Sequence, residues 1–222
     1  MAAIFLTKLQ TDPHLFVYVV VTVILSITVH ELAHGYVALR LGDPTPKVSG
    51  HWTVNPVVHM GAPSLVMLLL FGIAFGAMPV DPTRLRGKRA EALVALAGPL
   101  SNLALALIAA TALGVWQLAV DGQAASVMAE NLRQFVFVFS VINLALALFN
   151  LLPVPPLDGA HVLAGLVPAY RRWLRSIADP RMLLGVLLLV FFALSQVEGG
   201  VTAPAAAGVG AYLEWLYGLA GR

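Results

Sequence analysis

Long apolar segments that are nearly free of charge recur along this chain, and they restrict its possible folds more than any other feature. Five are long enough to consider as membrane spans: residues 15–41, 62–78, 90–120, 127–152 and 182–197. Only 11% of the 222 residues are charged, whereas a soluble globular domain carries roughly a quarter. So few charges cannot cover a folded chain in water, so part of its surface must face lipid. We therefore expect an all-α polytopic membrane protein.

These segments, with one more near the end, predict the number of helices. We expect about five to six transmembrane or re-entrant helices in one membrane-embedded domain over residues 1–222, with a core at 15–165 and C-terminal helices at 166–222. The segment at 62–78 has 17 residues, or ~25 Å of helix, which is short for a hydrocarbon core of roughly 30 Å. The segment at 203–219 is rich in Ala and Gly, which favours a weak span or an interfacial helix. No clear cleavage site marks a signal peptide, so we expect the first apolar run to be retained.

Charged residues mark the loops between the segments. Basic residues follow the first, second and fourth segments: Arg40, Lys47, Arg84, Arg86, Lys88, Arg89, Arg171, Arg172, Arg175 and Arg181. Acidic residues mark the other loops: Asp121, Glu130 and Glu198. Loops rich in Lys and Arg stay in the cytoplasm, and every basic cluster falls there only if the second segment dips into the membrane and returns on the same side. We therefore expect a re-entrant second segment and an N-terminus outside, in a multi-pass protein of a prokaryotic plasma membrane. The small net charge of +2, spread over short clusters, indicates no nucleic-acid partner.

The stretch between the first two segments has a different pattern. Over residues 47–59, Val48, Trp52, Val54 and Val58 alternate with polar side chains. A period of two predicts a short β-strand or hairpin with one polar face. Extended backbone beside a membrane is tolerated where it lines a wet cavity walled by protein. We therefore expect this strand to line such a cavity, and its edge to pair with an unwound substrate.

The sequence His30-Glu31-Leu32-Ala33-His34 lies in the second half of the first span. Positions i and i+4 share one face of a helix, so both imidazoles can reach a single zinc ion. The intervening Glu31 is then placed to act as the base that activates water. The alternative is a polar patch that faces a neighbouring helix. Three ionisable groups within one turn of an apolar span are expensive, however, and this favours a metal site.

Catalytic zinc usually takes three protein ligands, and two histidines leave the site incomplete. The chain has no cysteine, so the third ligand must be His, Asp or Glu. Asp158 is the best distant candidate, because Pro155 and Pro156 break the preceding helix and Gly159 permits a tight turn. The alternative is that Asp158 merely caps the helix that begins near Gly159.

The motifs HELAH, NPVVH, AGPLSN and FNLLPVPPLDG follow one another in this order. Together they resemble the site-2 protease family of intramembrane zinc metalloproteases over about residues 29–163, in a minimal form without PDZ or CBS domains. The resemblance implies one Zn²⁺ per chain, held by His30, His34 and Asp158, with Glu31 as the catalytic residue. It also implies an endopeptidase that cleaves single-pass membrane proteins within or near their transmembrane segment. One departure is the sequence after NPVVH, which continues Met-Gly where many relatives have Ile-Asp.

Three residues of the middle motifs are candidates for binding the substrate or stabilising the transition state. Asn102 opens a long span, where its amide either contacts the substrate or oxyanion or bonds between helices. Asn55 and His59 lie on one face of the expected strand, and a substrate contact and a structural role are equally open for both.

For the other polar residues near the expected zinc site, we favour a structural or supporting role. Asn150, also a candidate for substrate contact, precedes the Pro-rich break, and a bond to freed backbone groups is favoured. Asn143 lies one heptad earlier, where interhelical hydrogen bonding is expected. His161 follows Asp158 by three positions, and packing or support of the metal site is favoured over direct ligation.

The expected function is regulated intramembrane proteolysis with the active site towards the cytoplasmic side. One alternative is a metal-ion or proton transporter, because intramembrane His, Asp and Glu also mark ion pathways. Another is a catalytically silent membrane scaffold. The sequence is also compatible with a homo-oligomer.

Overall fold

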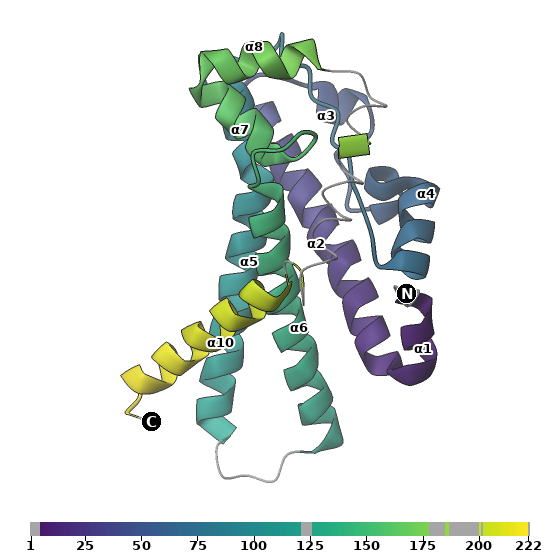
Figure 1. Ribbon diagram of the computed structural model, residues 1–222, viewed down its shortest axis with the longest axis vertical. Coiled ribbons are helices and arrows are strands. Elements are labelled where there is room, and N and C mark those ends of the chain that lie inside the picture. Colours follow the sequence, from purple (N-terminus) through teal and green to yellow (C-terminus); the bar gives the residue numbers. More distant parts are fainter. Residues whose placement is uncertain (1–4, 121–125, 178–184, 187–199, 201, 222) are drawn as a thin grey trace.

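The computed structural model describes residues 5–120, 126–177, 185–186, 200 and 202–221, and every regular element in this part of the chain is helical (Figure 1). Three of its helices are long and apolar enough to cross a membrane: α2 (Pro13–Arg40), α5 (Ala90–Val120) and α6 (Val127–Asn150). They confirm the helices expected at the first, third and fourth apolar segments. The segment at 182–197 lies outside the described residues apart from 185–186.

Helix α5 runs antiparallel to α2 and α6, so the end of α2, the start of α5 and the end of α6 lie in the upper part of Figure 1. Helix α5 packs against both α2 and α6. Its buried positions are mostly small: Ala90, Ala92, Ala95, Gly98, Ala106, Ala110 and Gly114. Small side chains let the backbones of neighbouring helices approach closely. In lipid, where the hydrophobic effect does not drive helices together, the van der Waals contacts of this close packing hold them.

Helix α10 (Thr202–Leu219) corresponds to the last apolar segment and packs across α5 and α6 at some distance from α2 (Figure 1). Its buried residues Ala205, Val209 and Leu213 join Leu113 of α5 and Val141 of α6 in one apolar cluster. The remaining helices are short: η1 (Phe5–Thr7), α1 (Lys8–Thr11), α3 (Thr45–Val48), α4 (Pro56–Phe71), α7 (Asp158–Leu166) and α8 (Pro168–Ser176).

The β-strand or hairpin expected over 47–59 is wrong. Helix α3 occupies the start of this stretch, and α4 begins at Pro56. Asn55 is the N-cap of α4, with its side chain accepting from Val57 N–H at 3.0 Å, and Pro56 stands at the first helical turn. An Asn cap followed by Pro is a helix start signal, and it outweighs the alternation of Val and polar residues around it.

The second apolar segment is helical over a different range from the one expected. Helix α4 has 16 residues, bends at Gly61 (φ 65°, ψ 167°) and is capped at its C-terminus by Gly72, whose left-handed φ of 71° suits glycine. An extended segment, 73–80, then leads back towards the start of α5 (Figure 1). Its backbone is held by α4: Phe75 N–H donates to Ser64 Oγ at 2.9 Å, and Ala77 N–H donates to the His59 carbonyl at 3.0 Å. Extended backbone is therefore present, but after α4 rather than before it.

The buried carboxylate of Asp43, in the loop after α2, binds the backbone just after this extended segment. Asp43 is fully buried and accepts from the Thr45 backbone N–H at 3.0 Å and from Asp81 N–H at 2.8 Å. Burial by itself would raise the pKa of Asp43, but these hydrogen bonds and that from the Thr45 hydroxyl outweigh it and lower the pKa below its ordinary value.

Candidate metal centre

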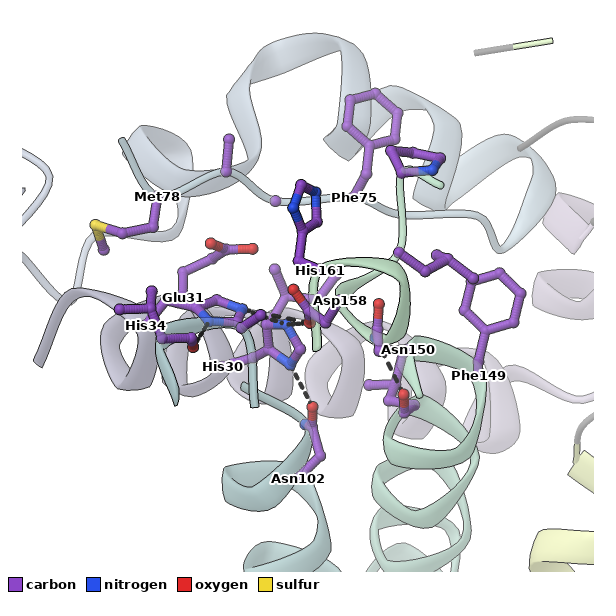
Figure 2. A pocket seen from close by; sticks show the side chains of 18 of the residues that line it. His30, Glu31, His34, Phe75, Met78, Asn102, Phe149, Asn150, Asp158 and His161 are labelled. Carbon is purple, nitrogen blue, oxygen red and sulfur yellow. Dashed lines mark hydrogen bonds and ion pairs between the residues drawn. The ribbon is translucent and has the colours of Figure 1, made fainter. Parts of the chain in front are cut away.

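His30 and His34 lie one turn apart on α2, and Asp158 is the first residue of α7. The His30 Nε2 atom lies 3.0 Å from His34 Nε2 and 3.0 Å from Asp158 Oδ2, while His34 Nε2 lies 3.4 Å from that oxygen (Figure 2). Ligands 2.0–2.1 Å from a tetrahedral zinc stand about 3.3 Å apart. The three ligand atoms therefore have the spacing that zinc requires.

The protonation of the two imidazoles also suits a cation. His34 Nδ1 lies 2.7 Å from the Val94 carbonyl, which can only accept, so this nitrogen carries the proton. In a neutral imidazole the Nε2 atom then presents its lone pair to the ligand group. Asp158 Oδ2 is buried and has no hydrogen-bond donor among the described residues. Lone pairs converging on one point without donors are unfavourable unless a cation lies between them.

A chain of amides fixes the protonation of His30 in a similar way, by placing an acceptor at its Nδ1 atom. Asn143 Nδ2 donates to the Phe139 carbonyl at 2.9 Å, so its Oδ1 accepts from Asn102 Nδ2 at 3.0 Å. Asn102 Oδ1 is then free to accept from His30 Nδ1 at 2.6 Å (Figure 2). The direction of every bond follows from one backbone carbonyl of α6. Both ends of the Asn102 amide are engaged, and the residue orients His30 from a fully buried position on α5.

Asp158 is brought to the histidines by the turn between α6 and α7. Leu157, not Asp158, is the N-cap of α7, and its backbone is extended. A Cβ on Gly159 would lie 2.2 Å from the Leu151 carbonyl oxygen, so this turn closes tightly only with glycine. The Asp158 carboxylate is thus directed at the histidines and does not cap α7.

Two further glycines let the backbone approach the site. A Cβ on Gly98 of α5 would lie 2.4 Å from His34 Nε2 and 2.5 Å from His30 Nε2. A Cβ on Gly76, in the extended segment, would lie 2.5 Å from Glu31 Oε1. Glu31 is buried and points to the extended segment, on the opposite side of the histidines from Asn102 (Figure 2).

The site opens into a cavity of about 550 Å³. Its walls come from α2, α5, the extended segment, the end of α6 and the start of α7. They are mostly apolar, and polar groups gather at the ligand group: His30, Glu31, His34, Asn102, Asn150, Asp158 and His161. A cavity that combines apolar walls with a few converging polar groups is typical of a substrate site.

The other predicted residues are placed as follows. Asn150 lines the cavity and donates to the Leu146 carbonyl of its own helix at 3.0 Å, and His161 lines it one turn after Asp158. His59 is buried, and its Nε2 lies 2.6 Å from the Thr53 carbonyl. Neither His59 nor Asn55 is among the residues that line the cavity. Substrate contacts for these residues stay predictions.

Sequence reasoning missed the two glycines and the extended segment 73–80. Gly76 lies isolated within an apolar run, and such a glycine can indicate a close approach of the backbone to another group. Gly98 precedes Pro99 inside a helix, where glycine is unfavourable without a packing reason.

Comparison with known proteins agrees with this geometry. A model of peptidase family M50 matches residues 113–194. The putative zinc metalloprotease YwhC of Bacillus subtilis is 42% identical over 154 residues, covering 68% of this chain and 69% of YwhC. The putative zinc metalloprotease Rip2 of Mycobacterium tuberculosis H37Rv is 32% identical over 192 residues, covering 83% and 70%. The zinc metalloprotease MJ0392 of Methanocaldococcus jannaschii is 25% identical over 174 residues, covering 77% and 41%. No solved structure matches the chain significantly.

The likeness to YwhC and Rip2 extends over two thirds or more of each protein and of this chain. This chain has three helices long and apolar enough to cross a membrane, and the part of it that the structure describes contains a His, His and Asp group spaced for zinc. This chain belongs to peptidase family M50, the site-2 protease family of zinc metalloproteases.

Proposed function

We propose that this protein is an intramembrane zinc endopeptidase that hydrolyses peptide bonds within or near the transmembrane segment of single-pass membrane proteins. The observation that carries the proposal is the depth of the ligand group in α2. His30 lies ten residues before the end of a 28-residue apolar helix, which is about 15 Å along its axis. Peptide bonds that reach this depth belong to segments within the bilayer.

We assign metal binding to His30, His34 and Asp158, and proton transfer to Glu31. Bound zinc supplies a Lewis acid that polarises a carbonyl and activates water. Glu31 lies next to the histidines without joining the ligand group, so its carboxylate is available to take a proton from water and pass it to the leaving amine. The Asn102 amide and the Val94 carbonyl hold the two imidazoles in one tautomer throughout.

We further propose that the active site faces the cytoplasmic side of a prokaryotic plasma membrane. The basic loops expected in the cytoplasm lie at the end of the bundle where α2 ends and α5 begins (Figure 1). The cavity is nearest to this end, because Val80 at the end of the extended segment and the loop residues Pro82 and Leu85 also line it. Water therefore has its shortest route to the metal from that side.

The test compares wild type with Glu31→Gln in detergent, measuring zinc content and cleavage of a model single-pass substrate. Glu214→Gln, an exposed position on α10, is the matched control. We expect stoichiometric zinc in all three proteins and cleavage by wild type and Glu214→Gln only. Cleavage by Glu31→Gln would refute the assignment of the base. Zinc transport into liposomes without cleavage would favour the transporter instead.

A further inference from the structure

Helix α8 differs from the other helices in its composition. Tyr170, Trp173 and Leu174 lie at i, i+3 and i+4, so they share one face, while Arg171 and Arg172 lie on another. Trp173 is 48% exposed. A short, strongly amphipathic helix with an aromatic face and a basic face is typical of a helix that lies in the membrane interface.

The position of α8 fits this interpretation. It lies across the end of the bundle where α2 ends and α5 begins (Figure 1). If α2, α5 and α6 cross the membrane, α8 lies parallel to the membrane surface. Two contacts fix it there: Tyr170 Oη donates to the Pro153 carbonyl at 2.8 Å, and Arg171 Nε donates to the Ala164 carbonyl at 2.9 Å.

The neighbouring loop adds positive charge to the same surface. Lys88, Arg89 and Arg171 line one small hollow between the start of α5 and the end of α7. Lys88, Arg89 and Arg172 are exposed, and no ion pair is found for them in the part of the chain that the structure describes. Glu91 is the one acidic residue in the wall of this hollow. The surface therefore presents several unpaired cations beside an exposed indole.

We propose that α8 and the loop 84–89 form a docking surface for the anionic headgroups of membrane phospholipids. Charge complementarity favours this ligand, because the cytoplasmic leaflet has a negative surface potential that attracts basic segments next to spans. The apolar face of α8 enters the interface, and Arg172 and Lys88 contact the phosphates. This inference rests on the proposed cytoplasmic orientation but not on peptide hydrolysis, and its charged groups Lys88, Arg89 and Arg172 are not among the residues that line the active-site cavity.

The experiment uses the full chain in mixed micelles with Trp173 as the sole tryptophan, after replacing Trp52, Trp116 and Trp215 by Phe. Energy transfer from Trp173 is measured during titration with dansyl-labelled phosphatidylglycerol or phosphatidylcholine. We expect half-saturation at a lower concentration of the anionic lipid. Each charge near the surface is worth about fivefold in affinity, so the double variant Lys88→Gln/Arg172→Gln should weaken phosphatidylglycerol binding by about 25-fold.

The control is Lys8→Gln in α1, at the opposite end of α2, which should leave both titrations unchanged. Equal transfer from the two lipids would overturn the proposal, and so would a preference for phosphatidylglycerol that survives the double variant. Neither readout involves zinc or proteolysis, so failure here is distinguishable from failure of the proposed function.

Discussion

Replacing Gly98 by alanine should weaken zinc binding at least about a hundredfold without unfolding the protein. The added methyl group would lie 2.4 Å from His34 Nε2 and 2.5 Å from both Nε2 and Cε1 of His30. Contacts between nonbonded carbon and nitrogen need at least about 3.4 Å. One or both ligand atoms must therefore move by about 1 Å, or α5 must withdraw from α2 by the same distance.

The size of this displacement determines the expected loss of affinity. Metal–ligand distances tolerate about 0.2 Å, so a shift of about 1 Å removes one ligand or both. Loss of a residue that only orients a ligand weakens metal binding 10–100-fold. Displacement of the ligands themselves should exceed this, and we expect zinc affinity at least about a hundredfold below that of wild type.

The assay is competition with a chromophoric zinc chelator in detergent, with circular dichroism to check helix content. The matched control is Gly210→Ala in α10, because a Cβ at Gly210 meets no atom within 4 Å. Alanine there should leave zinc affinity unchanged and stabilise α10 slightly. Zinc affinity of Gly98→Ala equal to that of wild type, with helix content intact, would refute the assignment of His30 and His34 as joint ligands in this geometry.

Four other substitutions test separate parts of the structure. Asn102→Leu removes the acceptor of His30 Nδ1 and should lower zinc affinity 10–100-fold. The same chelator competition measures this, and an unchanged affinity would argue against the amide chain. Gly76→Ala would place its Cβ 2.5 Å from Glu31 Oε1, so peptidase activity should fall while bound zinc stays stoichiometric; normal cleavage would contradict this close approach. Tyr170→Phe removes the bond to Pro153 near the Asp158 turn and should lower zinc affinity a few-fold. Asp43 has a lowered pKa in the folded state. Its ionised carboxylate therefore stabilises the folded protein at pH values above its unfolded pKa of about 3.9, and this contribution is lost as the pH falls through its pKa in the folded state. Asp43→Asn should therefore lower the free energy of unfolding, measured by thermal denaturation, by about 1–3 kcal/mol at pH 7 and by less at pH 3. An equal loss at both pH values would refute the charge effect.

The sequence by itself determined the features that depend on neighbouring residues. Hydropathy over some twenty residues identified α2, α5 and α6, because a lipid-facing helix must be apolar along its whole length. The i, i+4 spacing placed His30 and His34 on one face, since helical geometry is local. Local patterns still compete, and the Asn-Pro start signal of α4 prevailed over the alternation that favoured a strand.

Only the tertiary structure decided what depends on distances between elements. Asp158 is more than a hundred residues from His34. The Pro-rich break and the family resemblance made it a candidate ligand, but a helix-capping role stayed open, and only the structure brings its Oδ2 within 3.4 Å of His34 Nε2. The direction of the amides depends on how α5 meets α6, the Gly98 contacts on how α5 meets α2, and the place of the extended segment on its bonds to α4. Such approaches depend on the packing of several helices at once, and no spacing along the chain encodes them.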